Sequence, residues 1–397
     1  MSRPDGPGLG RLPITGVLVA EIGLAVALGL LALEAGLLPL AGVVVSLALV
    51  AGLVRVRGEL VGTWAALALR HRLRPREVPA AEPGEGLGLP GVDAAVGRID
   101  VVDTRDHDGR PVALLGGPDG AWSAVLVPEA EDLPLLLDPT TTDAPPATLD
   151  PVDRVGGGLG GVPLSVLAGT LADRGVVLDA VTVVRHVRPG GAESPARTAH
   201  REVLGPLSDA AHRSVWLVVR LDPGRCPDAV TARGGGVLGV RRALVGSLAR
   251  IGRVLADHDV PVRPVDRDGL REAVAVAAGS DLDRTPGGVQ ERWDAVVIGE
   301  VGHATWTATA LDPRGLDLDA LVAPDAVCTT ALALVAADTP DEVGVDLRVR
   351  VTAHTPAEVV AAGRELVGVA RARGVRLEPL HGRQGAGLRT TLPLGAR

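Results

Sequence analysis

The sequence predicts an N-terminal two-helix transmembrane hairpin followed by an α/β (α+β) domain. Two apolar runs, at residues 14–33 and 37–54, are separated by only three residues. Each run is about as long as the ~20 residues that a helix needs to cross a ~30 Å hydrocarbon core. Beyond residue 92, apolar residues alternate between the spacing of strands and the spacing of helices, which predicts a mixed domain.

The break between the two runs is too short to hold an exported domain. We therefore expect a tight hairpin over residues 12–54, preceded by a tail at 1–11. Arginines flank both outer ends of the hairpin, whereas the turn contains Glu34 and no arginine. The positive-inside rule predicts a multi-pass protein of the cell (inner) membrane, with both termini and the remaining domain in the cytoplasm.

Small residues and one acid mark a candidate packing face on the first run. Gly16, Ala20, Gly23 and Ala27 recur at spacings of three and four residues, which lets another helix approach closely. Glu21 is ionisable at membrane depth, where such a group is functional or bonds a neighbouring helix. Because the runs hold no second charge for a relay, the sequence favours a structural hydrogen bond for Glu21.

An amphipathic basic helix is predicted directly after the hairpin, over residues 55–77. Trp64 lies on its apolar face, and Arg70, Arg72 and Arg74 gather at its end. A tryptophan at the headgroup level and arginines facing anionic lipid are typical of an interfacial helix. The alternative is a helix that extends the second span into the cytoplasm.

The composition restricts both the core and the partners. Lysine, asparagine, phenylalanine and tyrosine are absent, so all 40 basic residues are arginines and the core must use Leu, Val and Ala. Residues 1–76 carry eight arginines against four acids, whereas the rest carries 32 against 44. This acidic remainder argues against nucleic acid as a partner. Cys226 and Cys328 are too few for a disulfide framework or a zinc site, and we expect two buried thiols.

The mixed domain is predicted to have two halves. A linker at 78–91, rich in Pro, Gly and Glu, precedes the first half at 92–278, and a second linker at 279–292 precedes the second half at 293–397. The first half is expected to contain strands at 98–103, 110–115, 122–127, 176–187, 214–221 and 260–265, and helices at 164–174, 238–257 and 267–278. The second half is expected to contain strands at 293–298, 303–311, 327–336, 343–353 and 375–380, and a helix at 356–373.

The two halves echo each other. Residues 122–128 resemble 306–313, and residues 259–264 resemble 374–379. Each half then follows the order strand, helix, two strands, helix, strand, which is the βαββαβ arrangement. Duplication and similar local physics both produce such an echo, so the sequence leaves its origin open.

Two motifs with possible chemistry have simpler structural explanations. Gly234-Gly-Gly-Val-Leu-Gly239 matches a phosphate-binding pattern, but it does not directly follow a strand, so a flexible lead-in to a helix is favoured. Asp106-His107-Asp108 resembles the D-x-D of metal-dependent glycosyltransferases, yet it stands where a hairpin needs an Asp-Gly turn. We assign no catalytic, cofactor-binding or metal-binding residue. The alternative is a membrane-tethered glycosyltransferase-like enzyme that uses Asp106, Asp108 and the Gly234 loop on a nucleotide-activated substrate.

Several segments resemble one known family. They are residues 216–230, 233–239, 262–270, the strand beginning at Trp293, and 303–306. Together with the order of the predicted parts, they resemble the EccE family, membrane core subunits of the actinobacterial type VII (ESX) secretion system. The resemblance implies a structural subunit with two transmembrane helices and a peripheral cytosolic domain. It further implies EccB, EccC, EccD and the lipid bilayer as partners, and no enzymatic activity or cofactor.

Overall fold

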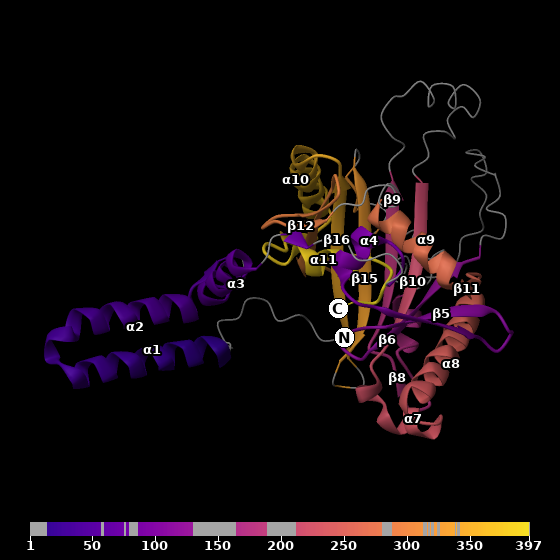
Figure 1. Cartoon of the computed structure of the whole chain (residues 1–397), viewed down its shortest axis with the longest axis horizontal. Helices are drawn as coiled ribbons and strands as arrows, with labels where there is room; N and C mark the ends of the chain where they lie inside the picture. Colours follow the sequence, from indigo (N-terminus) through magenta and orange to yellow (C-terminus); the bar gives the residue numbers. More distant parts are fainter. Residues whose placement is uncertain are drawn as a thin grey trace. The chain divides into compact units, whose positions relative to one another are not determined.

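The chain divides into two compact units, Met1–Pro75 (unit 1) and Arg76–Arg397 (unit 2). Unit 1 contains a helical hairpin, and unit 2 contains a large sheet with helices on both faces (Figure 1). The computed structural model describes residues 14–56, 59–74, 77–78, 86–129, 164–188, 212–279, 288–312, 316, 318, 321–323, 326–337, 339 and 342–396.

Two antiparallel helices and a third, shorter one make up unit 1. Its elements in chain order are α1 (Ile14–Leu33), the 3-10 turn η1 (Ala35–Leu37), α2 (Leu38–Leu53), β1 (Arg55–Val56), β2 (Glu59–Leu60) and α3 (Val61–Leu73). Pro39 lies in the first turn of α2, where a missing N–H costs no hydrogen bond. β1 and β2 pair with each other and lead the chain into α3.

The prediction of a two-helix transmembrane hairpin is wrong. Among the described residues, no helix combines the length and the apolar character required to cross a membrane. The second apolar run is shortened at both ends, because η1 takes up Ala35–Leu37 and α2 stops at Leu53. The 16 residues of α2 extend about 24 Å, less than the ~30 Å of a hydrocarbon core.

Small residues bring α1 and α2 together. Gly23 and Ala27 on α1 are buried, as are Ala41 and Gly52 on α2. A Cβ atom added to Gly23 would collide with the Cβ of Ala48, so the missing side chain sets the distance between the helices. Part of the small-residue face predicted on the first run is therefore used within the hairpin itself.

The centre of unit 2 is one antiparallel sheet with 13 strands in the described residues. The strand order is β3-β12-β13-β14-β16-β15-β9-β10-β6-β5-β4, while β11 pairs with β6 and β17 with β14. The strands are β3 (Glu77–Val78), β4 (Asp100–Arg105), β5 (Pro111–Gly116), β6 (Trp122–Pro128), β9 (Ala180–Arg188), β10 (His212–Leu221), β11 (Val262–Pro264), β12 (Val289–Glu291), β13 (Val296–Ile298), β14 (Val301–Ala310), β15 (Val327–Ala336), β16 (Val343–Ala353) and β17 (Arg376–Pro379). A separate small sheet pairs β7 (Ala172–Asp173) with β8 (Val176–Val177).

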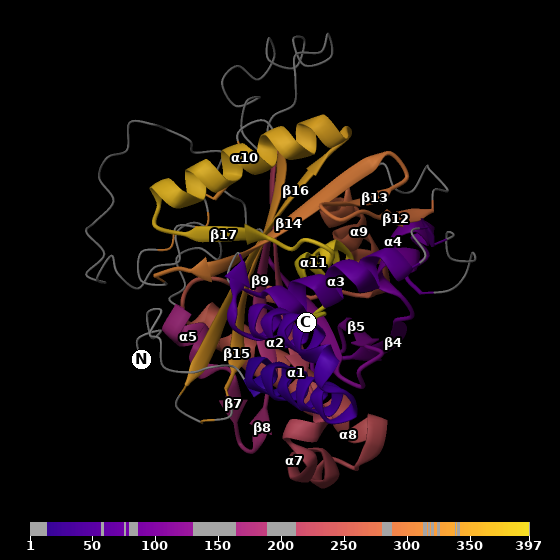
Figure 2. The ribbon, with the colours of Figure 1, turned by 90° about the vertical axis from the view of Figure 1, so that its left-hand side faces the viewer.

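Helices cover both faces of the large sheet. They are α4 (Pro90–Val96), α5 (Leu164–Gly169), the 3-10 turn η4 (Pro223–Arg225), α7 (Pro227–Ala232), α8 (Gly236–Ala256), α9 (Arg267–Ala278), α10 (Pro356–Ala372) and α11 (Gln384–Thr391). One face packs against α8 and α10, and the opposite face packs against α4, α9 and α11. Figure 2 shows α10 lying along β17 and over β14 and β16, which it contacts. Unit 2 therefore has three layers, with the sheet in the middle.

The expectation of two βαββαβ-like halves is also wrong, because the strands of both halves form one sheet. β9 pairs with β15 along a register that runs from Val187 opposite Cys328 to Ala180 opposite Val335. The strand order is symmetric about this pair: β9-β10-β6-β5-β4 extends one way and β15-β16-β14-β13-β12 the other. β11 and β17 occupy matching places on β6 and β14.

Many local predictions are confirmed. α9, β15 and β16 have the predicted bounds, and α8 and α10 end within one residue of theirs. The predicted strand at 176–187 is divided instead into β8 and β9. Cys226 and Cys328 are both free and buried, as expected.

We predict opposite effects of alanine at two glycines of α1. Gly23→Ala should destabilise the hairpin by about 1–3 kcal/mol, because the new Cβ meets Ala48. Gly29→Ala should stabilise it by about 0.5–1 kcal/mol, since nothing lies within 4 Å of a Cβ at Gly29 and alanine favours helix. Hydrogen exchange of the α1 amides measures both effects, and changes of the same sign would contradict the packing described.

Candidate functional site

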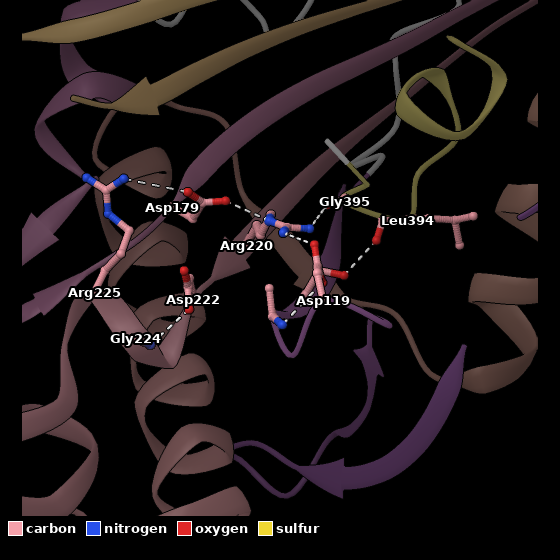
Figure 3. Close-up of polar contacts among 10 residues, drawn as sticks. Asp119, Asp179, Arg220, Asp222, Gly224, Arg225, Leu394 and Gly395 are labelled. Atoms are coloured by element: carbon pink, nitrogen blue, oxygen red, sulfur yellow. Dashed lines mark hydrogen bonds and ion pairs between the residues drawn. The ribbon is translucent and has the colours of Figure 1, made fainter. Parts of the chain in front are cut away.

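Among the described residues of unit 2, the densest set of ion pairs surrounds Arg220 (Figure 3). We call this set, formed by Asp119, Asp179, Arg220, Arg225 and Gly395, the Arg220 hub. Arg220 Nε donates to Asp179 Oδ2 at 2.7 Å, and Nη2 donates to Asp119 Oδ2 at 2.5 Å. Its Nη1 donates to the carbonyl oxygen of Gly395 at 2.7 Å. One guanidinium therefore joins three separate segments of the chain.

The sheet register places these groups together. Arg220 lies near the end of β10, opposite Ala180 of β9 and Ser123 of β6. Asp179 directly precedes β9, and Asp119 lies in the turn between β5 and β6. The hub therefore lies where the neighbouring strands β9, β10 and β6 begin or end, at one end of this part of the sheet. Ser123 Oγ also donates to the carbonyl oxygen of Leu394 at 2.7 Å, which fixes the C-terminal segment beside the hub.

The hub is partly shielded from solvent. The side chains of Arg220 and Asp179 are 12% and 8% exposed, whereas that of Asp119 is 51% exposed. Burial raises the pKa of the Asp119 carboxyl, but the hydrogen bond and charge of Arg220 outweigh burial and hold this pKa below its ordinary value. Burial lowers the pKa of Arg220, while the hydrogen bonds that it donates to Asp119 and Asp179 raise this pKa above its ordinary value. Asp119 and Arg220 are therefore both ionised near neutral pH.

The residues after Arg220 form a rigid corner. Asp222 Oδ1 accepts a hydrogen bond from the Gly224 N–H at 2.8 Å and caps η4. Arg225 lies 3.8 Å from Asp179 Oδ1 and donates to the carbonyl oxygen of Ala337 at 3.0 Å. These charged side chains are used to fix the backbone between β10 and α7.

A second polar group lies inside unit 2, on the sheet face covered by α9 and α11. We call His186, His303, Thr329, Arg350 and Thr352 the Arg350 row, because neighbouring strands place them side by side. Arg350 Nη2 donates to Thr329 Oγ1 at 3.1 Å and to the carbonyl oxygen of Ala277 at 2.5 Å. Arg350 Nη1 lies 3.1 Å from His303 Nδ1. The arginine therefore ties the last turn of α9, where helix carbonyls carry partial negative charge, to three strands.

The hydrogen bonds of the Arg350 row determine the protonation of His303 Nδ1. A guanidinium only donates, so His303 Nδ1 accepts and carries no proton. Thr329 Oγ1 accepts from Arg350 Nη2 and forms a second hydrogen bond with His186 Nδ1, 3.0 Å away. Burial and then the charge of Arg350 lower the pKa of His303 well below its ordinary value. Burial lowers the pKa of Arg350 itself to about 9, so it stays charged at neutral pH.

The sequence-predicted packing and interface residues all lie in unit 1. Glu21 is exposed on α1, Ala20 is half-buried there, and Gly23 and Ala27 face α2; Gly16 lies in the first turn of α1. On α3, Trp64, Arg70 and Arg72 are exposed, and Arg74 caps the helix end. The structure therefore gathers the three predicted arginines at one end of α3, in agreement with their spacing.

The motifs of the enzymatic alternative are used for folding. Asp106 Oδ1 accepts from the N–H groups of Asp108 and Arg110 at 2.9 and 2.8 Å, which closes the β4–β5 turn. Gly234, Gly235 and Gly236 all have positive φ, a region that favours glycine. A Cβ at Gly239 would collide with the carbonyl oxygen of Val230, so this glycine permits α7 to pack against α8. Within the described residues, no group of three or more His, Cys, Asp or Glu is arranged to hold a metal ion.

The part of the chain that matches a known protein family includes the strand that carries Arg220. Residues 209–308, which include β10, the corner after Arg220, α8 and α9, match the family model described as "EccE: Putative type VII ESX secretion system translocon, EccE". Over these residues the chain is similar to the EccE family. The resemblance inferred from the sequence is thereby confirmed.

Named EccE proteins are similar over parts of the chain. The ESX-1 secretion system protein EccE1 of Mycobacterium tuberculosis is 31% identical over 144 residues, which are 36% of this chain and 28% of that protein. The ESX-5 secretion system protein EccE5 of Mycobacterium marinum is 29% identical over 206 residues, 49% of this chain and 44% of that protein. The chain thus matches less than half the length of these EccE proteins.

One solved structure is also matched, that of aclacinomycin oxidoreductase, at 12% identity. The match covers 80% of this chain and 66% of that one. Its TM-score of 0.24 is too low to indicate a shared fold.

Sequence reasoning did not find the Arg220 hub or the Arg350 row. Both show the same signal in the sequence, a charged residue with large apolar neighbours in a strand: Arg220 stands between Val219 and Leu221, and Arg350 between Val349 and Val351. Such a residue is expected to be buried with partners, since an unpaired buried charge is costly. The partners themselves, from Asp119 to Gly395, lie too far along the chain to be found from spacing.

We predict that Arg220→Met destabilises unit 2 by about 2–4 kcal/mol, because it removes the Arg220 hydrogen bond to the buried Asp179 carboxylate. Urea unfolding of the full chain measures the change. Asp119→Asn is the matched control, and it should cost about 1 kcal/mol or less because Asp119 is half-exposed. Equal decreases in the free energy of unfolding of the two variants would show that the contact between Arg220 and Asp179 does not stabilise unit 2.

We predict that the free energy of unfolding decreases as the pH falls below about 6.5. His303 stays neutral in the folded state while the unfolded chain binds a proton, so the folded state loses about 1.4 kcal/mol per pH unit for this group. Above pH 6.5 neither state is protonated at His303 and the contribution is constant. Urea unfolding of the full chain at pH 5 to 8 measures the slope, which His303→Gln should reduce. His107→Gln, in the exposed β4–β5 turn, should leave the slope unchanged.

Proposed function

We propose that this chain is a structural subunit of a type VII (ESX) secretion complex at the cell membrane. Its work would be to bind other subunits, among them EccB, EccC and EccD, with unit 2 on the cytoplasmic side. The observation that carries the proposal is the EccE family match over residues 209–308. This region holds the Arg220 hub's central arginine and both helices that follow it, so the matched segment belongs to the stable centre of unit 2.

The surface of the α1–α2 hairpin supports an assembly role. Large apolar side chains are exposed along both helices: Leu18, Val19, Ile22, Leu24, Val26, Leu28 and Leu33 on α1, and Leu38, Leu40, Val43, Leu47, Leu49, Val50 and Leu53 on α2. A contiguous apolar surface of this kind marks contact with protein or membrane. We assign it to helices of partner subunits and to lipid, with the exposed Glu21 as a hydrogen-bond partner for one of those helices.

The end of α3 supports a position close to the membrane. Arg70 and Arg72 are exposed in its last turn, and Trp64 is 38% exposed one and a half turns earlier. Arginines attract anionic lipid headgroups, and tryptophan is suited to the headgroup layer. We propose that this end of α3 lies at the membrane surface.

Co-purification in mild detergent tests the proposal. A tagged chain should retain the other secretion subunits, and deletion of residues 14–54 should abolish this, because the apolar surface of the hairpin is removed. Mass spectrometry of the purified complex measures the result. Retention of all subunits by the deleted chain would contradict the role given to the hairpin.

Asp106→Ala is the matched variant for the enzymatic alternative. We expect it to preserve both complex assembly and secretion, since Asp106 closes a surface turn. Loss of secretion from an assembled complex would instead support a chemical role for Asp106 and overturn the structural one.

A further inference from the structure

One exposed surface of unit 2 combines apolar and basic side chains. It lies on the first two turns of α8 and consists of Val237, Leu238 and Arg242, with Arg233 and Arg241 beside them. Val237 and Leu238 are 50% and 51% exposed. Among the described residues of unit 2 they are the only consecutive pair of exposed large apolar side chains. We call these five residues the α8 patch.

The local fold holds the α8 patch in place. An ideal Cβ on Gly234 would lie 3.6 Å from Leu238 Cδ2 and 3.2 Å from Arg242 Nη1, so both side chains lie over this glycine. Arg242 Nη1 donates to the carbonyl oxygen of Arg233 at 3.0 Å, and Arg233 Nη1 donates to that of Ala229 at 2.8 Å. Val237 and Leu238 are therefore exposed on a part of the chain that these hydrogen bonds hold in place.

The positive charge of the α8 patch is not neutralised by the described residues. Arg233 and Arg242 bind carbonyl oxygens, and Arg241 lies over the ring of Trp122 at 5.7 Å. No carboxylate among the described residues forms an ion pair with these three arginines. A partner that brings carboxylates to the patch would gain charge-assisted hydrogen bonds without displacing existing ion pairs.

We propose that the α8 patch binds a short, acidic, leucine-rich segment of another protein. Apolar side chains of the segment would cover Val237 and Leu238, and its carboxylates would face Arg233 and Arg242. The spacing of leucines in an amphipathic helix, with acids between them, suits a surface of this size. The inference rests on the proposed function, because the segment is expected on another subunit of the same complex.

An anionic bilayer has similar chemistry but fits the observations less well. Residues 77–397 carry 32 arginines against 44 acids, so the long-range field of unit 2 repels an anionic surface. A short peptide interacts mainly with the side chains of the patch itself, because salt screens charges beyond a Debye length of about 8 Å. The charged side chains of the patch are arginines. Two apolar side chains also provide much less insertion than stable membrane anchoring requires.

A labelled peptide with purified full-length chain tests the surface directly. The probe is a helical peptide of leucines and glutamates, and its matched control replaces every glutamate with arginine. We expect the glutamate peptide to bind, Leu238→Ser and Arg242→Glu each to weaken binding at least tenfold, and the arginine peptide not to bind. Val360→Ser, an exposed apolar residue on α10, should leave binding unchanged.

Unchanged binding in Leu238→Ser, or equal binding of both peptides, would overturn the proposal. Competition by phosphatidylglycerol vesicles that is lost in Leu238→Ser would assign the patch to a bilayer instead. A photo-crosslinking residue at position 238 in the assembled complex gives the second readout. A cross-linked peptide from another subunit, rich in acids and leucines, supports the proposal, whereas cross-links only within this chain or to a non-acidic peptide contradict it. If the peptide and cross-linking experiments contradict the α8 patch proposal while the other subunits still co-purify, only this proposal is overturned and the proposed function is not.

Discussion

The pairing of β9 with β15 is the interaction on which unit 2 depends. β9 is bonded on one side to β10 and on the other to β15, so it joins segments that are far apart in the sequence. Its register sets Val187 opposite Cys328 and His186 opposite Thr329, and thereby decides which residues share a face. The apolar layers under α8 and α10 and the buried Arg350 row on the opposite face are both consequences of that register.

The sequence predicted local elements much better than their assembly. The periodicity that marks α9 and the β15–β16 hairpin is contained within each segment, so their bounds could be read directly. The sheet order depends on pairings such as Thr182 with Ala333, between residues whose local patterns carry no trace of each other. For the second apolar run, the membrane-spanning prediction equated run length with helix length, whereas Leu37 belongs to η1 and α2 ends at Leu53.

The polar sites also differ in how far along the chain their partners lie, and the sequence predicted only the local contacts. Asp106 was expected to serve a turn, and its hydrogen bonds confirm this, because an Asp-x-x-Gly turn is decided within a few residues. Arg220 and Arg350 were visible as charges in apolar strands, but their partners come from turns, helix ends and neighbouring strands. The family resemblance could be recognised before the geometry was known, because a match along the chain does not require knowledge of which residues are in contact.

The contacts of the last described residues have a consequence for the order of synthesis. Leu394 and Gly395 bind Ser123 and Arg220, which precede them by 271 and 175 residues, and Leu388 packs in the same apolar layer as Val125. A nascent chain thus carries an uncovered sheet face until these residues have left the ribosome. Folding of unit 2 is therefore completed only after Gly395 has been translated, and until then apolar surface that these residues cover in the folded state stays exposed.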